Sequence, residues 1–203
     1  MFSYLIMGAA FAFAASVQPG PLLTYIVSET LEKGWRRTLP ASLAPIVSDG
    51  PIILLVLLVL SQVPGWFVQS MHFAGGILLF YLAYSAFKSW RDYDENKIIN
   101  PVGGKQTLMK AALVNFLNPN PYIGWSLIMG PLFLKGYNET PANGIGLLIG
   151  FYFTMTASLA TIIFVFAFAR KLGPKVNRLM LGLSVVALAF FGIYQLWLGF
   201  SLI

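Results

Sequence analysis

The sequence predicts an all-α integral membrane protein in which six transmembrane helices form two inverted three-helix repeats. Three observations lead to this prediction: the composition, six apolar stretches of spanning length, and a proline break in each half. Of the 203 residues, 58% are hydrophobic and 10% are charged, whereas soluble domains carry about 25% charged residues. A soluble chain of this length has too much surface to hide so many apolar side chains. We therefore expect lipid to be the solvent.

Each spanning helix needs about 20 mostly apolar residues, and six stretches meet this requirement. Two inverted repeats then cover residues 1–87 and 108–203, and a solvated cytoplasmic linker covers residues 88–107. The residues between the second and third stretches, 62–65, are too few for anything but a tight hairpin. The predicted spans are Ser3–Val27, Leu39–Ser61, Trp66–Phe87, Leu108–Leu134, Asn143–Phe168 and Leu179–Leu202.

The basic residues occupy alternate loops. Among 13 Lys and Arg residues, Lys135 is the single one that six spans place on the other side of the membrane. Because cytoplasmic loops are rich in Lys and Arg, we predict a bacterial plasma-membrane protein with both termini outside. This arrangement accounts for the net charge of +6 without nucleic acid as a partner. The residues on the predicted cytoplasmic side are Lys33, Arg36, Arg37, Lys88, Arg91, Lys97, Lys105, Lys110, Arg170, Lys171, Lys175 and Arg178.

The first and fourth stretches contain matching breaks. Residues Gln18–Tyr25 and Asn118–Trp125 both read polar, Pro, any residue, Pro, with an aromatic residue four positions after the second proline. Proline removes a backbone donor and disrupts the preceding helical turn, and the freed carbonyls must face protein or a water-filled cavity. Paired broken helices in inverted halves indicate a transporter's binding site. The alternative is a pair of kinks that serve packing alone.

These breaks supply the candidate substrate-binding residues. Asn115 joins them because three amides close together in an apolar stretch need polar partners. The asparagines are expected either to line the site or to cap the broken helix ends. The candidates are Pro19, Gly20, Pro21 and Tyr25 from the first break, and Asn115, Asn118, Pro119, Asn120 and Pro121 from the second.

Asp49 is the candidate proton-coupling residue. It lies about ten residues into the second stretch, or about 15 Å along a helix, which places it near the middle of the bilayer. A carboxylate at this depth is a functional candidate by default, because it can bind a cation, carry a proton or receive a substrate ammonium. The alternative is a helix end among hydrated headgroups.

Other polar residues and the glycines receive structural interpretations. Glu29 and Glu32 follow the first break and are interpreted as interfacial, as is His72, the only histidine, which cannot build a metal site alone. Cysteine is absent, and we expect no bound metal, cofactor or enzymatic activity. Five glycines are expected to allow close helix approach: Gly75, Gly76, Gly146, Gly150 and Gly182.

At these residues the sequence resembles the LysE-type (LysE/RhtB) translocators, a family of small bacterial amino-acid exporters. The family implies export of amino acids or related small solutes, driven by the proton gradient. The sequence departs from the family pattern at Thr38, where a glycine is frequent, and over Ala44–Val47, where a glycine-rich segment is frequent. These departures keep the substrate open. The resemblance rests on Pro19-Gly20-Pro21, Gly34-Trp35-Arg36, Asp49, Gly75-Gly76, Tyr81-Leu82-Ala83 and Asn115-Phe116-Leu117-Asn118-Pro119.

The combined interpretation is a secondary active transporter that exports amino acids or related small solutes across the cytoplasmic membrane by proton antiport. Its expected partners are an amino acid-like small molecule, protons and the lipid bilayer, and a homodimer is one assembly that the sequence leaves open. A divalent metal exporter is an alternative, although it would need several converging ligands. A non-transporting membrane scaffold is a second alternative, but it needs no polar interior.

Overall fold

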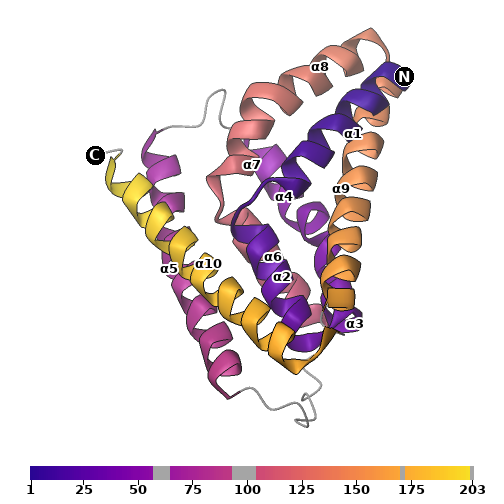
Figure 1. Ribbon diagram of the computed structural model, residues 1–203. Helices are drawn as coiled ribbons and strands as arrows, with labels where there is room; N and C mark the ends of the chain where they lie inside the picture. The colour runs from indigo at the N-terminus through magenta and orange to yellow at the C-terminus, as the bar shows by residue number, and fades with distance from the viewer. Residues whose placement is uncertain (57–64, 93–103, 170–171, 202–203) are drawn as a thin grey trace.

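A computed structural model describes residues 1–56, 65–92, 104–169 and 172–201, and every element in these ranges is a helix (Figure 1). The predicted hairpin turn at residues 62–64, most of the predicted linker at residues 93–103, and residues 170–171 lie outside the described residues. The elements are α1 (Phe2–Val17), α2 (Pro21–Lys33), α3 (Trp35–Thr38), the 3₁₀ helix η1 (Leu39–Leu43), α4 (Ala44–Leu54), α5 (Gly65–Arg91), α6 (Gly104–Phe116), α7 (Pro119–Gly124), the π-helical segment η3 (Trp125–Met129), α8 (Gly130–Glu139), α9 (Pro141–Ala169) and α10 (Pro174–Ser201).

Three of the described helices, α5, α9 and α10, are each long and apolar enough to cross a membrane. The pair α1 and α2 meets the same criteria as one bent span, so the described residues hold three or four candidate spans. These helices correspond to the first, third, fifth and sixth predicted spans. The described residues of the second and fourth predicted spans form shorter helical pieces. The all-helical membrane fold is therefore confirmed, while the count of six spans stays a prediction.

The first break separates α1 from α2 and bends the chain by 63°. Gln18 and Gly20 both have extended backbone conformations, because Pro19 and Pro21 cannot donate the hydrogen bonds that a continuous helix needs. Pro21 is the first residue of α2, a position where the missing N–H would have had no partner in any case. The sequence thus dictates both the end of one helix and the start of the next.

The second break separates α6 from α7. The side chain of Asn118 accepts a hydrogen bond of 3.1 Å from the backbone N–H of Asn120, and Pro119 is the first residue of α7. Asn118 is therefore a helix N-cap, which confirms one of the two roles expected for the asparagines. The chain then passes through η3, and short π-helical turns of this kind are frequent at functional sites.

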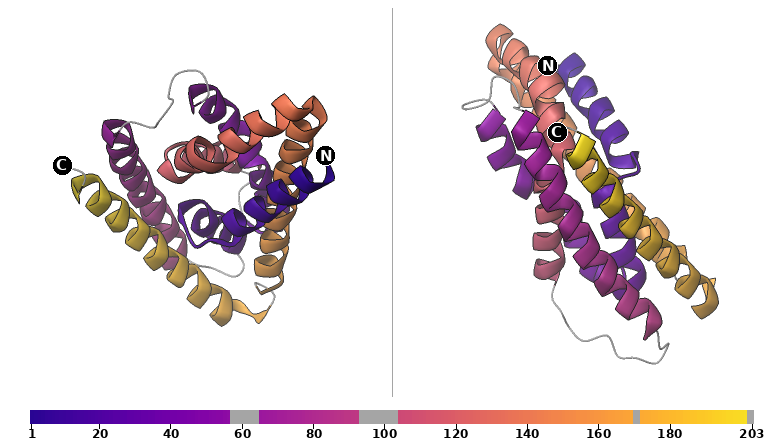
Figure 2. Two further views of the ribbon diagram at one scale, coloured as in Figure 1. Left: turned by 90° about the horizontal axis from the view of Figure 1, so that it is seen from above. Right: turned by 90° about the vertical axis from the view of Figure 1, so that its left-hand side faces the viewer.

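Two long pairs of helices frame the molecule: α1 packs along α9, and α5 packs along α10 (Figures 1 and 2). Glycine makes the first pair close. A Cβ on Gly150 would overlap the carbonyl oxygen of Leu5, and one on Gly8 would overlap the carbonyl oxygen of Leu147. In the second pair, a Cβ on Gly76 would lie 2.7 Å from a methyl carbon of Leu196.

The other glycines expected to mediate close approach also have close neighbours. A Cβ on Gly75 would lie 2.8 Å from the carbonyl oxygen of Leu117, and one on Gly182 would lie 2.9 Å from the indole nitrogen of Trp90. A Cβ on Gly146 would lie 3.0 Å from the side chain of Met1. The expectation of close approach between helices is confirmed at Gly76 and Gly150, whereas Gly75 meets the loop residue Leu117, Gly146 meets Met1 before α1, and Gly182 meets the end of the Trp90 side chain.

Helix α2 lies in the interior and contacts α9, α10, α6 and α5. Figure 2, viewed from above, shows the first broken helix between the α5–α10 pair and α9. The core around it contains the fully or almost fully buried side chains of Tyr25, Ile26, Ile52, Met129 and Ile163. At the first break Gln18 and Pro19 are exposed and Pro21 is buried; at the second, Asn118 and Pro119 are buried and Asn120 is exposed.

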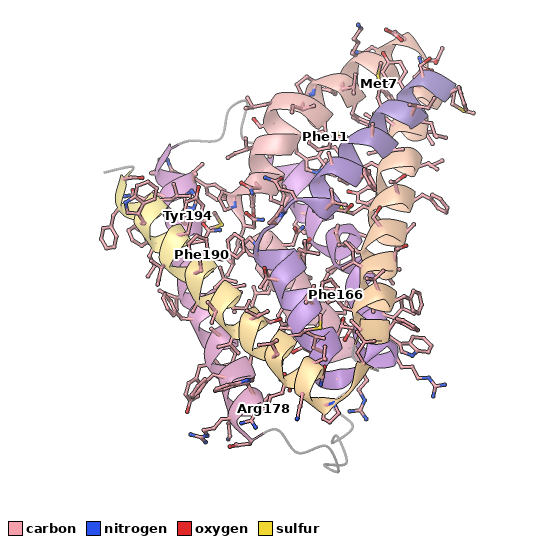
Figure 3. The ribbon with its side chains drawn as sticks, in the orientation of Figure 1. Met7, Phe11, Phe166, Arg178, Phe190 and Tyr194 are labelled. Carbon is pink, nitrogen blue, oxygen red and sulfur yellow. The ribbon has the colours of Figure 1, made fainter. Side chains whose placement is uncertain are left out.

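The two ends of the molecule differ in charge. Both termini lie at one end, and α3 lies at the other with the ends of α2, α5 and α9 and the beginnings of α6 and α10 (Figure 1). We call the second one the basic end, because these segments carry Lys33, Arg36, Arg37, Lys88, Arg91, Lys105, Lys175 and Arg178. Figure 3 shows Arg178 at this end.

Two polar residues that were interpreted as interfacial are buried instead. His72 is 7% exposed, and its Nδ1 atom is bonded to Oε1 of Gln195 on α10. Glu29 is also 7% exposed. In both residues the hydrogen-bond partners explain the difference, because a buried polar group is stable once it is paired. Gln195 and Thr107 lie far away in the sequence, whereas Lys33, which also bonds to Glu29, lies one helical turn away.

Candidate functional site

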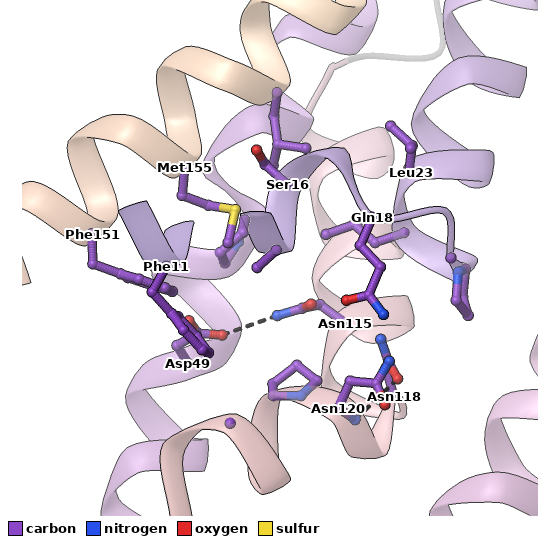
Figure 4. Close-up of a pocket in the computed structure, with 18 of the residues that line it drawn as sticks. Phe11, Ser16, Gln18, Leu23, Asp49, Asn115, Asn118, Asn120, Phe151 and Met155 are labelled. Atoms are coloured by element: carbon purple, nitrogen blue, oxygen red, sulfur yellow. Dashed lines mark hydrogen bonds between the residues drawn. The ribbon is translucent and has the colours of Figure 1, made fainter. Parts of the chain in front are cut away.

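A cavity of about 150 Å³ lies between the two helix breaks (Figure 4). Helices α1, α2, α4, α6, α7 and α9 all contribute to its lining, together with Trp125 from η3. The volume is large enough for several water molecules and is on the scale of a small solute rather than of a drug-sized ligand. Six polar side chains line it: Ser16, Gln18, Asp49, Asn115, Asn118 and Asn120.

Asp49 is the only ionisable residue among those that line the cavity. It lies on α4 and is 2% exposed. The Nδ2 atom of Asn115 donates to its Oδ1 atom over 3.0 Å and to Oγ of Ser48 over 2.8 Å. The side chain of Trp125 is a further hydrogen-bonding neighbour. Within the described part of the chain, no ion pair involves Asp49.

The local sequence explains how the carboxylate reaches this position. Helix α4 follows directly from η1, and Pro45 stands in its first turn while Pro51 interrupts the hydrogen bonds further along. Ser48 donates back to the carbonyl oxygen of Ala44 over 2.9 Å, which leaves its oxygen free to accept from Asn115. A short irregular helix with its own internal bonds thus holds Asp49 against α6.

The cavity brings together most of the predicted binding residues, from segments far apart in the chain. Figure 4 shows the amides of Gln18, Asn118 and Asn120 on the side of the cavity that faces Asn115 and Asp49. The predicted residues that line the cavity are Pro19, Gly20, Pro21, Asp49, Asn115, Asn118, Asn120 and Pro121.

Two predicted binding residues do not line the cavity. Tyr25 is 2% exposed and belongs to the core beyond it, and its hydroxyl has no hydrogen-bond partner among the described residues. Pro119 is buried in the second break as the first residue of α7. Tyr25 continues α2 away from the break, so the two matched aromatic residues differ: Tyr25 lies in the core, whereas Trp125 lines the cavity.

Apart from Trp125, which ends the second break, the sequence interpretation did not identify the apolar wall of the cavity. This wall includes Phe11 on α1, Trp125 on η3, and Phe151, Met155 and Leu159 on α9. The three α9 residues are spaced by four, which puts them on one helix face, but the whole helix is apolar and the spacing does not stand out. Gln18 was also missed, although it precedes the first break as Asn118 precedes the second.

The side chains that line the cavity include an acidic group but no basic one. The lining holds one carboxylate and four amides, and none of the lining residues is Lys, Arg or His. The first turn of α2 also faces the cavity with backbone N–H groups that no side chain caps. Such a helix end carries a partial positive charge. The site can therefore accept an ammonium group at Asp49 and an anionic group at α2.

The family model described as LysE type translocator matches residues 13–200, which include every lining residue of the cavity except Phe11. The chain belongs to the LysE type translocator family. This member of the family is therefore a multi-pass membrane transporter of amino acids or similar solutes rather than an enzyme. No curated protein and no solved structure matches the chain closely enough to add a second comparison.

Proposed function

We propose that this LysE type translocator is a secondary active transporter that exports amino acids or related small solutes in exchange for protons. The observation that carries the proposal is the position of Asp49, a buried carboxylate that lines the cavity between the two breaks. The cavity is then the substrate site, and Asp49 is the group at which substrate and proton meet.

Competition for Asp49 provides the exchange. A charged carboxylate inside a membrane protein is costly unless a cation or a proton neutralises it. Asn115 and Ser48 supply hydrogen bonds but no charge. A substrate ammonium and a proton are two ways to neutralise the same group, and they exclude each other. A carrier that changes conformation only when Asp49 is neutralised then moves one in each direction.

A zwitterionic solute fits the remaining surfaces of the cavity. Its carboxylate would meet the uncapped first turn of α2, which Gly20 and Pro21 begin. Its other polar groups would meet the amides of Asn118, Asn120 and Gln18. A small apolar side chain would pack against the Phe151 wall. Pro19, Pro119 and Pro121 act indirectly in this proposal, because they keep the two breaks open.

We also propose the inverted arrangement of residues 1–87 and 108–203 around a cytoplasmic linker at residues 88–107. The positions of the breaks support it, since each follows the first helix of its half. Both termini lie at the end opposite the basic end (Figure 1). The positive-inside rule then puts the basic end in the cytoplasm and both termini outside the plasma membrane.

The metal-export and scaffold alternatives have less support. Among the described residues, no three His, Cys, Asp or Glu side chains form a group that could hold a metal ion. A scaffold would leave Asp49 and the breaks far apart, whereas here they line one cavity. No observation favours either alternative over solute export.

The test is the Asp49→Asn variant, assayed for efflux of labelled amino acids from vesicles with an imposed pH gradient. The amide keeps the size of the side chain and cannot bind a proton or pair with an ammonium, so we expect proton-driven export to fall to the background level. Glu139→Gln is the matched control, because Glu139 is exposed at the end of α8. Export by Asp49→Asn at the wild-type rate and with the wild-type pH dependence would refute the proposal.

A further inference from the structure

A second buried carboxylate lies on the side of the cavity that faces the basic end. Glu29 on α2 is 7% exposed. Its two oxygens accept hydrogen bonds of 2.9 and 2.7 Å from the ammonium of Lys33, one turn further along the same helix. Oε2 of Glu29 also accepts a hydrogen bond of 3.1 Å from Oγ1 of Thr107 on α6. This hydrogen bond connects α2 to α6, the two helices that lie between the helix breaks and the basic end.

The cavity is closed in the direction of this bond. Three helices run from the cavity toward the basic end, and each has a fully buried apolar residue about one turn beyond a residue that lines the cavity. On α2 and α6, Glu29 and Thr107 follow about one further turn away. The lining residues are Leu22, Asn115 and Leu159, and the fully buried residues beyond them are Ile26, Ala111 and Ile163.

We infer that the Glu29–Thr107 hydrogen bond is the gate that closes the transport path between the cavity and the basic end. The inference rests on the proposed transport function, which requires the cavity to open to each side in turn. Helix α2 is joined to α1 through the extended residues of the first break, so it can tilt without distorting α1. Tilting α2 away from α6 separates Ile26 from Ala111 and opens the path.

The position of Lys33 explains why this gate can open. If the counter-ion of Glu29 were on α6, separation of the helices would leave a buried charge unpaired, which is strongly unfavourable. The counter-ion is instead on α2 and moves with Glu29. Of the described hydrogen bonds of Glu29, opening therefore breaks the one from the Thr107 hydroxyl and keeps those from Lys33.

The absence of cysteine from the chain allows a direct test by thiol accessibility. Leu23→Cys places a reporter thiol in the lining of the cavity, and a charged, membrane-impermeant thiol reagent is applied to each side of the membrane in turn. Adding Thr107→Val removes the hydroxyl and keeps the shape of the side chain. We expect the rate of labelling from the basic end to rise about fivefold, which corresponds to about 1 kcal/mol for one hydrogen bond.

Two further variants complete the experiment. Thr107→Ser keeps the hydroxyl and should restore the parental labelling rate. Thr161→Val is the matched control, because Thr161 is exposed on α9 and, among the described residues, its hydroxyl bonds within its own helix, to the carbonyl oxygen of Ala157. Should Thr107→Val fail to yield folded protein, Thr107→Ala carries the same prediction.

Equal labelling of the parent and the Thr107→Val variant from the basic end would overturn the gate, as would an equal increase in Thr161→Val. The readout does not depend on substrate or on a pH gradient. If Asp49→Asn exported normally while Thr107→Val was labelled faster, proton exchange at Asp49 would be refuted and the gate would still be supported. If Asp49→Asn lost export while Thr107→Val was labelled at the parental rate, the gate would be refuted and the proposed function would still be supported.

Discussion

The contact between Asn115 and Asp49 can be measured as a coupling energy. Asn115→Leu keeps the approximate volume of the side chain and removes the Nδ2 donor that serves both Asp49 and Ser48. A hydrogen bond to a charged group contributes about 1.5–3 kcal/mol, whereas polar bonds between membrane helices average about 0.6 kcal/mol. We therefore expect Asn115→Leu to destabilise the protein by about 2–3 kcal/mol, most of it from the bond to Asp49.

A double-mutant cycle separates the two bonds. Thermal unfolding in detergent is measured for the wild type, Asn115→Leu, Asp49→Asn and the double variant. The amide oxygen introduced by Asp49→Asn can still accept from Asn115, so the non-additive part is the share of the pair energy that depends on the charge. We expect a coupling of about 1 kcal/mol or more, the difference between a bond to a charged group and a neutral bond between membrane helices. Ser48→Ala with Asn115→Leu should couple more weakly, by about 0.6 kcal/mol.

Additive effects of Asn115→Leu and Asp49→Asn would contradict this account of the site. They would mean that Asn115 does not stabilise a charged carboxylate. A coupling with Ser48 that equals or exceeds the coupling with Asp49 would contradict it as well, because Asn115 would then serve only to join α6 to α4. Export by Asn115→Leu, assayed beside Asp49→Asn, shows whether loss of the donor also impairs transport.

Two further predictions concern the helices that form the site. Gly150→Val should lower the unfolding temperature in detergent sharply, because the new side chain would collide with the backbone of Leu5. The expected cost is about 1–3 kcal/mol or more. Gly50→Ala is the control and should leave the unfolding temperature nearly unchanged, because a Cβ at Gly50 meets no neighbour within 4 Å. Asn118→Ala should cost about 1 kcal/mol, since it removes the cap bond to the N–H of Asn120. Asn118→Ser keeps a neutral cap acceptor and should lose less stability; equal unfolding temperatures for the two variants would argue against the cap.

The breaks and Asp49 could be predicted from the sequence because their signals are local. Proline lacks a backbone donor wherever it stands, so the paired prolines of each break indicate the helix boundaries near Pro19, Pro21 and Pro119 without any knowledge of the fold. A carboxylate in a long apolar stretch such as that around Asp49 stands out for the same reason, since hydrocarbon offers it no partner.

The rest of the site depends on contacts that no local pattern records. Phe151 and Met155 face the cavity, but in a helix that is apolar all round, the protein-facing side cannot be distinguished from the lipid-facing side. His72 was assigned to the interface because its partner, Gln195, lies 123 residues away. The burial of Glu29 was missed similarly, because its partner Thr107 lies 78 residues away.

The two buried carboxylates of this protein show why Asp49 is the better candidate for proton exchange. The fold neutralises Glu29 with Lys33 at 2.7 Å, and this permanent counter-ion leaves the carboxylate little reason to bind a mobile one. Asp49 is more deeply buried, at 2% exposure against 7%, and within the described residues it has hydrogen-bond donors but no ion pair. Only its charge remains to be balanced by something that enters the cavity. In the proposed mechanism Glu29 therefore helps to hold the path closed, and Asp49 is neutralised by substrate and by proton in turn.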